Sequence, residues 1–397
     1  MSDNDFPAGN ALTNANDSAY AVVSASRATP IEDLLRLVLE EGSSDLHITA
    51  GSPPTLRIDG QIVKLSMPPL TPADTEEMIR SFAKDEYIKR LLEHGGADFA
   101  VAFREDARFR VSLFLQKGAF GMVARLIPRK ILGMEEIGLP AAMKELIHLP
   151  RGLILVTGPT GSGKSTSLAS MINVINEHSR LHIVTVEDPI EYFHEHKRGI
   201  VNQREVGVDV PTFGEALKRV LRQDPDVILV GEMRDQETMA AAITAAETGH
   251  LVFSTLHTTG AARTVDRIID SFPAGEQEQI RIQLAGNLKA VLSQMLIPLK
   301  DGRGRVAAFE LMINTPSVAS LIRENKTYRI GNDILTGSKY GMVSLESNMV
   351  ELYRRGLINR VDVLARALDT NVANQLLNEA EVPGSSHRGG VVAVGRT

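Results

Sequence analysis

The stretch "GPTGSGKST" at 158–166 has the residue types and the spacing of a phosphate-binding loop. It matches G-x-x-x-x-G-K-[ST], in which the glycines let main-chain N–H groups wrap around phosphate oxygens. An apolar strand pattern precedes it and a helical pattern begins at Lys164, so the helix dipole would also favour an anion. Lys164 is expected to reach the β- and γ-phosphates, and the Ser165 hydroxyl to bind Mg²⁺. The predicted Mg-ATP site comprises Gly158, Pro159, Thr160, Gly161, Ser162, Gly163, Lys164, Ser165 and Thr166.

A carboxylate follows a second apolar strand pattern, "DVILVGE". ATPases with a phosphate-binding loop usually carry an Asp here that holds Mg²⁺, but this chain has Gly231 in that place. Glu232 comes next and is the candidate catalytic group that orients the attacking water. The alternative interpretation of Glu232 is an ordinary surface charge at the end of a strand.

Three more carboxylates lie in "VTVEDPIEY" at 184–192, where another strand pattern ends. In a doubly wound sheet, the carboxyl ends of the strands converge on the ligand crevice. One of these groups could replace the missing Asp on Mg²⁺, directly or through water. We take Asp188 as the candidate metal ligand, Glu187 as a catalytic candidate and Glu191 as a nucleotide-binding candidate. The alternative is a turn and helix-capping cluster, because Asp-Pro is common in turns.

Two histidines flank the apolar run in "GHLVFSTLHTT" at 249–259. If the run is a regular strand, His250 and His257 lie about 20 Å apart and on opposite faces, so they cannot share a metal ion. His257 follows the strand, at the expected phosphate edge of the sheet, and is a candidate for contact with the γ-phosphate. His250 precedes the strand, which favours a structural or interface role.

The composition restricts the class of protein that positions these groups. The chain has 397 residues, 43% of them hydrophobic and 23% charged, as in soluble globular proteins of two or three domains. Its net charge of −6 shows no overall basic character that would indicate a nucleic-acid partner. With no cysteine, disulfides, thiolate zinc sites and iron–sulfur clusters are excluded, and a cytoplasmic location fits. We find neither a secretory signal nor an apolar run of about 18 residues, so we expect at most a peripheral membrane association.

The patterning along the chain predicts two domains. The first is a small α+β domain with an amphipathic helix and short strands, including a hairpin turn at Asp59-Gly60. The second alternates strands and helices, which predicts an α/β fold with a parallel sheet and helices on both faces, followed by an antiparallel hairpin turning at Asp301–Gly304 and a helical C-terminal part. The expected divisions are a disordered extension at 1–29, the α+β domain at 30–127, a linker at 128–140, the ATPase domain with its C-terminal helices at 141–375, and a flexible tail at 376–397.

In their order along the chain, the phosphate loop, the acidic segment, the Glu232 segment and the histidine segment resemble the motifs of the secretion and pilus ATPase family of phosphate-loop motors. The small domain adds "SDLHITAG" and "LRIDG", and the C-terminal part adds "SVASLIRENKTYRI" and "TGSKYGM". Within the family, the chain is most similar to the branch that retracts type IV pili. Leu321, Ile322, Arg323 and Glu324 match the pattern associated with retraction, Val318 is a conservative change, and Ser317, Ala319 and Ser320 depart from it.

This resemblance implies a PAS-like small domain and a RecA-like motor domain that work as a homo-hexamer. It implies that arginines of "RFRVSLFLQKGAFGMVAR" approach the γ-phosphate, with Arg110 and Arg125 as the best matches, and it gives His250 a nucleotide-motif role. The implied activity is ATP hydrolysis that powers pilus retraction and twitching motility. The implied partners are an inner-membrane platform protein, to which the ring binds peripherally from the cytoplasm, and a paralogous pilus ATPase; no direct contact with nucleic acid is expected.

Three alternatives remain open on the sequence alone. A paralogous accessory, extension or secretion ATPase would share the motifs. A regulatory ring that binds ATP without hydrolysing it is suggested by the missing Asp at Gly231. A ring that moves nucleic acid would need a basic channel lined with aromatic residues, whereas aromatic residues make up 5% of this chain and tryptophan is absent.

Overall fold

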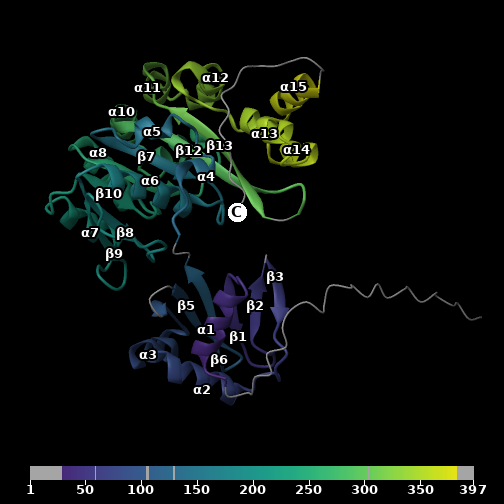
Figure 1. Ribbon diagram of the computed structural model, residues 1–397. Helices are drawn as coiled ribbons and strands as arrows, with labels where there is room; N and C mark the ends of the chain where they lie inside the picture. Colours follow the sequence, from purple (N-terminus) through teal and green to yellow (C-terminus); the bar gives the residue numbers. More distant parts are fainter. Residues whose placement is uncertain (1–28, 59, 104–106, 128–129, 303, 382–397) are drawn as a thin grey trace, which may run out of the picture. The chain divides into compact units, whose positions relative to one another are not determined.

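The computed structural model describes residues 29–381, apart from 59, 104–106, 128–129 and 303. It divides into two compact units, with the boundary between Leu126 and Ile127 (Figure 1). The disorder expected for 1–28 and 382–397, the turn residue Asp59 and the first linker residues fall outside the described residues, as does Arg303 of the second predicted turn. Within the described residues, no helix combines the length and the apolar character needed to cross a membrane.

Unit 1 is built on a six-stranded sheet in the order β3-β2-β1-β6-β5-β4. The pairs β1–β2, β1–β6, β2–β3 and β4–β5 are antiparallel. Thr71 caps the start of helix α2: its hydroxyl accepts the N–H of Asp74 while the Asp74 carboxylate accepts that of Thr71, so the sequence itself fixes this helix start. The elements are α1 (Ile31–Glu40), β1 (Asp45–Ile48), β2 (Thr55–Ile58), β3 (Gln61–Lys64), α2 (Pro72–Phe82), α3 (Asp85–His94), β4 (Gly96–Phe103), β5 (Ala107–Gln116) and β6 (Ala119–Ile127).

Unit 2 is built on a seven-stranded sheet in the order β13-β12-β7-β11-β10-β8-β9, which confirms the predicted α/β class. All neighbouring strands from β12 to β9 run parallel, and β13 is antiparallel to β12, as predicted for the hairpin. Its strands are β7 (Gly152–Thr157), β8 (His182–Glu187), β9 (Ile200–Glu205), β10 (Val227–Val230), β11 (Leu251–Leu256), β12 (Leu288–Pro298) and β13 (Arg305–Ile313).

The helices of unit 2 cover both faces of this sheet. They are α4 (Met134–Ile137), α5 (Met143–Leu146), α6 (Lys164–His178), α7 (Phe213–Val220), α8 (Gln236–Glu247), α9 (Ala261–Asp270), α10 (Gln277–Asn287), α11 (Pro316–Arg323), η1 (Thr327–Arg329), α12 (Ile330–Thr336), η2 (Ser338–Tyr340), α13 (Leu345–Arg354), α14 (Arg360–Arg366) and α15 (Thr370–Glu381). Helices α4–α6 supply the core on one face, helices α7–α12 that on the other, and α13–α15 pack together beside the β12–β13 hairpin.

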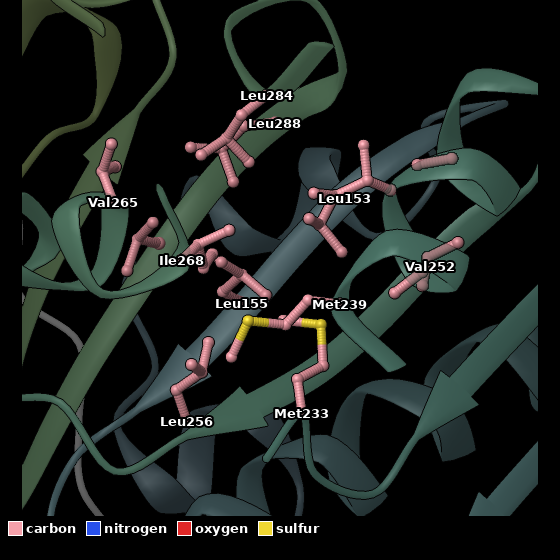
Figure 2. Close-up of a cluster of buried hydrophobic side chains, with 14 of the residues drawn as sticks. Leu153, Leu155, Met233, Met239, Val252, Leu256, Val265, Ile268, Leu284 and Leu288 are labelled. Atoms are coloured by element: carbon pink, nitrogen blue, oxygen red, sulfur yellow. The ribbon is translucent and has the colours of Figure 1, made fainter. Parts of the chain in front are cut away.

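Strand alternation explains how one sheet makes two cores. In β7, Leu153 and Leu155 belong to the core under α7–α12, and Ile154 and Val156 to the core under α4–α6, because successive side chains point to opposite faces. Figure 2 shows part of the first core, where β7 and β11 side chains meet those of α9 and α10 and the methionines Met233 and Met239.

Two predicted boundaries differ from the structure. The expected linker at 128–140 contains helix α4, and both Met134 and Leu139 are buried in the core of unit 2. The flexible tail expected from residue 376 was wrong for its first part, because α15 continues to Glu381 and Leu377 is fully buried against α13 and its neighbours. In both places, burial of apolar side chains keeps the segment folded against unit 2, although its sequence pattern did not indicate this.

Candidate nucleotide site

The loop at 158–163 joins the buried strand β7 to helix α6, as predicted. Gly158, Gly161 and Gly163 have φ of 142°, 75° and 87°, conformations that favour glycine. At Gly158 a side chain is also excluded by space, because a Cβ would lie 2.1 Å from the main-chain oxygen of Gln294. The glycines therefore let the main chain turn tightly enough to present N–H groups to an anion at the helix N-terminus.

Lys164 lies across this loop. Its Nζ donates to the main-chain oxygens of Gly158 at 2.9 Å and Pro159 at 3.1 Å. Burial lowers the pKa of Lys164, and the negative charges of Glu232 and Glu191 oppose that shift. The ammonium group is thus held at the loop with carboxylates nearby, where it can attract a phosphate group.

The residues of the loop and of the first turn of α6 differ in their exposure. Ser162 is buried, whereas Pro159, Thr160 and Gly161 are exposed and Ser165 is partly exposed in the first turn of α6. The Thr166 hydroxyl hydrogen-bonds to the Tyr192 hydroxyl at 2.9 Å. The loop thus has a buried base and an exposed upper surface, as a ligand-binding turn requires.

Glu232 and His257 come together at this edge of the sheet. Strands β10 and β11 are parallel neighbours, so the residues that follow them lie side by side. Nε2 of His257 lies 2.9 Å from Oε1 of Glu232, whose side chain is 18% exposed, and Nδ1 of His257 lies 3.4 Å from Oγ1 of Thr160 in the loop. Arg234, which the sequence did not indicate, contacts the other Glu232 oxygen at 2.8 Å. Contacts on both carboxylate oxygens therefore hold the Glu232 side chain in place.

The acidic segment after β8 lies next to β10. Glu187 is largely enclosed: its Oε1 accepts from Thr185 Oγ1 at 2.6 Å and from Gln203 Nε2 at 3.2 Å. Burial raises the pKa of Glu187 to about 7, despite these hydrogen bonds. Asp188 and Glu191 are exposed. In the described part of the chain, no three His, Cys, Asp or Glu side chains are grouped to hold a metal ion by themselves.

Residues distant in sequence connect the acidic segment to the phosphate loop. Gln203 of β9 donates to both Glu187 and the main-chain oxygen of Tyr192, the latter at 2.8 Å. Tyr192 in turn contacts Thr166 in the first turn of α6. These hydrogen bonds from Glu187 to Thr166 require β8 and β9 to be neighbouring strands. No local sequence signal could therefore have predicted the role of Gln203.

Packing against β8 favours glycine at position 231, where the sequence lacks the usual Asp. A Cβ at this position would lie 3.2 Å from Cα of Glu187 and 3.3 Å from the Val186 oxygen, both main-chain atoms that cannot easily move. A side chain at 231 would therefore make tight contacts with the main chain of β8. Glycine at 231 thus avoids tight main-chain contacts with β8, so the missing Asp is not by itself a sign of lost catalysis.

The other candidate residues lie elsewhere. His250 is at the opposite end of β11, where Nδ1 contacts the Ala245 oxygen at 2.9 Å, so it is not brought to the phosphate loop of its own chain. Arg110 lies on β5 and Arg125 on β6 of unit 1. Arg125 donates from Nε to Oδ1 of Asp45 at 2.7 Å; the Asp45 side chain is 3% exposed and that of Arg125 65%.

Known proteins are similar to this chain in sequence and fold. Residues 24–327 match the family described as "Type II/IV secretion system protein". The chain is 48% identical over 337 residues to "Type IV pilus retractation ATPase PilT" of Pseudomonas aeruginosa PAO1, covering 85% of this chain and 98% of that protein. It is 46% identical over 340 residues to "Twitching motility protein" of Neisseria gonorrhoeae, covering 86% and 88%. The crystal structure of the pilus retraction motor PilT with bound ADP superposes with a TM-score of 0.81 at 46% identity, covering 87% of this chain and 99% of that one.

Proposed function

Because the chain belongs to the family of type II/IV secretion system proteins, we propose that it is an ATPase that powers type IV pilus retraction and thereby twitching motility. One observation carries this proposal: the phosphate loop after β7, Glu232 after β10 and His257 after β11 lie at one edge of one sheet and are in contact. The relatives that are similar over most of the chain carry the names of pilus retraction and twitching motility proteins.

Each side chain has a role that its contacts support. The loop at 158–166 binds the phosphates through main-chain N–H groups and Lys164. Glu232 orients the attacking water and accepts its proton, and His257 connects that carboxylate to the loop. Glu187 and Glu191 border this site from the next strand, and Glu191 contributes negative charge at Lys164.

The donors also suit Mg²⁺, which prefers oxygen ligands and usually keeps several waters. The Ser165 hydroxyl and the exposed carboxylate of Asp188 would hold the ion together with the phosphates. The bound ion would neutralise phosphate charge. His250 remains a candidate for contact with nucleotide in an assembled ring.

The finer assignments are also part of this proposal. We assign unit 2 to the RecA-like motors and unit 1 to the PAS-like domains, working as a homo-hexamer in which Arg110 and Arg125 reach the γ-phosphate of a neighbouring subunit. The ring would bind a platform protein of the inner membrane from the cytoplasm, and a paralogous ATPase could join it. An arginine supplied by a separate domain stabilises the charge of the transferring phosphoryl group. When that group is hydrolysed and leaves, the arginine loses its partner and the domain can move.

The direct test is Lys164→Ala with purified protein. We expect ATP turnover to be lost, because the ammonium group no longer binds the phosphates. Lys144→Ala, an exposed lysine paired with Glu135, is the matched control and should retain turnover. In the parent bacterium, Lys164→Ala should leave cells covered in pili that no longer shorten. Normal turnover by Lys164→Ala would refute the site, and normal pilus shortening despite lost turnover would refute the retraction role.

A further inference from the structure

Gln294 of β12 is a buried amide next to the phosphate loop. It is 2% exposed. Strand β12 pairs in parallel with β7, and the preceding residue, Ser293, is in register with Thr157, the last residue before the loop. Gln294 therefore lies where β7 ends and the loop begins, although about 130 residues separate the two in sequence.

Both polar atoms of the Gln294 amide form hydrogen bonds. Nε2 donates to the main-chain oxygen of Ser162 at 2.5 Å, and Oε1 accepts from the Ser167 hydroxyl at 2.7 Å. Between these two serines, a Cβ on Gly163 would lie 3.1 Å from Nε2. The amide thus fits against the glycine that opens helix α6 and bridges the loop to the first turn of that helix.

The bond to Ser162 fixes a specific peptide group. In a trans peptide, the C=O of Ser162 and the N–H of Gly163 point in opposite directions. The carbonyl points inward to Gln294, so the Gly163 N–H points outward, away from the buried strand. Gly163 has a φ of 87° and tolerates other conformations, so without this bond the peptide could rotate and turn an oxygen toward the phosphate.

We propose that Gln294 is a positioning residue that holds the Ser162–Gly163 peptide in the orientation that binds phosphate. It does so without touching the nucleotide, by giving the buried carbonyl its hydrogen bond. This inference rests on the proposed function of the loop.

The first experiment measures binding of Mg-ADP to the full chain by titration calorimetry. Gln294→Met keeps the length of the side chain but removes both hydrogen bonds, so we expect affinity to fall about tenfold. Gln375→Met is the control, because this exposed glutamine of α15 bonds only to a residue of its own helix among the contacts described. The melting temperature of each nucleotide-free variant separates loss of folding from loss of binding.

A second variant has a readout that a structural role would not produce. In Gln294→Glu, a protonated carboxyl group can donate to Ser162 and accept from Ser167 as the amide does, whereas an ionised one repels the Ser162 oxygen. Burial favours the protonated form. We expect affinity within about twofold of wild type at pH 6 and about tenfold weaker than wild type at pH 8.5.

The outcomes distinguish the two claims. If wild type binds no ADP, the proposed function fails, and this inference fails with it. If wild type binds ADP and folded Gln294→Met binds it equally well, only the role of Gln294 fails. The role also fails if the affinity of Gln294→Glu, relative to wild type, is the same at both pH values.

Discussion

At the residue scale, the candidate chemistry centres on Glu232. One carboxylate oxygen contacts His257 and the other Arg234, so the side chain has little freedom to turn away from the loop. His257 also reaches Thr160, which places one imidazole between the loop and the carboxylate. A change at the phosphates can therefore reach Glu232 through a single side chain.

The corresponding prediction concerns Glu232→Gln. We expect ATP hydrolysis to fall at least about 100-fold, because an amide cannot accept a proton from the attacking water. Binding of Mg-ATP should persist, because the loop and Lys164 hold the phosphates. Phosphate release and ATP titration measure the two effects separately. Glu237→Gln, at an exposed ion pair with Lys218, is the control. Wild-type hydrolysis by Glu232→Gln would remove Glu232 from the mechanism.

At the element scale, the β12–β13 hairpin anchors the helix that follows His257. Oε1 of Glu310 on β13 accepts the N–H of Ala261, the first residue of α9, at 2.7 Å, and the Ser293 hydroxyl of β12 accepts the N–H of Gly260 at 2.9 Å. Glu346 of α13, whose own carboxylate accepts two main-chain N–H groups, adds negative charge near Glu310. Two strands and a C-terminal helix thus meet at the start of α9.

Glu310 makes the stability of unit 2 depend on pH. Burial raises the pKa of Glu310 to about 7 from the ordinary 4.5, with the charge of Glu346 adding to the shift and the Ala261 bond opposing it. Between these values the folded chain binds more protons than the unfolded chain, so the free energy of unfolding falls as pH rises. The stabilising contribution is complete below about pH 4.5 and is lost as pH rises through about 7.

We therefore predict that Glu310→Gln, which stays neutral, flattens this dependence. At pH 8 it should raise the free energy of unfolding by about 1–3 kcal/mol relative to wild type, with a smaller difference at pH 5. Denaturant titrations at the two pH values measure this. Glu278→Gln, an exposed residue of α10, is the control and should change neither value. An unchanged pH dependence in Glu310→Gln would show that Glu310 does not titrate in this range.

At the scale of the whole molecule, the proposed catalytic groups are divided between two units. Unit 2 carries the loop and Glu232, and unit 1 carries Arg110 and Arg125. Among the described residues, Arg125 bonds to Asp45 through Nε, and its side chain is exposed, so the terminal nitrogens of the guanidinium can bind an anion. If those nitrogens serve a neighbouring subunit, hydrolysis requires assembly.

Mixed assemblies test this division. Arg125→Ala and Lys164→Ala should each be inactive, but an equal mixture should recover about one quarter of the wild-type rate, because a site then needs one intact loop and one intact neighbour. The rate of phosphate release after mixing and reassembly measures the recovered hydrolysis. Arg36→Ala, an exposed arginine of α1, is the active control. No recovery in mixed rings of confirmed composition would show that Arg125 does not act between subunits.

Much of the local structure was determined by the sequence itself. The phosphate loop, strands β7, β8, β10 and β11, the β12–β13 hairpin and the Ser344 cap of α13 follow from neighbouring residues through glycine conformations, apolar runs and capping. Strand β9 was not predicted. The two ends of β11 were predictable for the same reason, which places His257 and His250 at opposite edges of the sheet.

Only the tertiary structure decided which side chains meet. The partners of the loop and the carboxylates come from strands that the order β13-β12-β7-β11-β10-β8-β9 makes adjacent, as Gln294 and Gln203 illustrate. Tertiary packing also makes a side chain at 231 a tight fit against β8 and keeps residues up to Glu381 in α15. Turns and caps depend on atoms a few residues apart, whereas these contacts depend on the order of strands, which the local sequence does not encode.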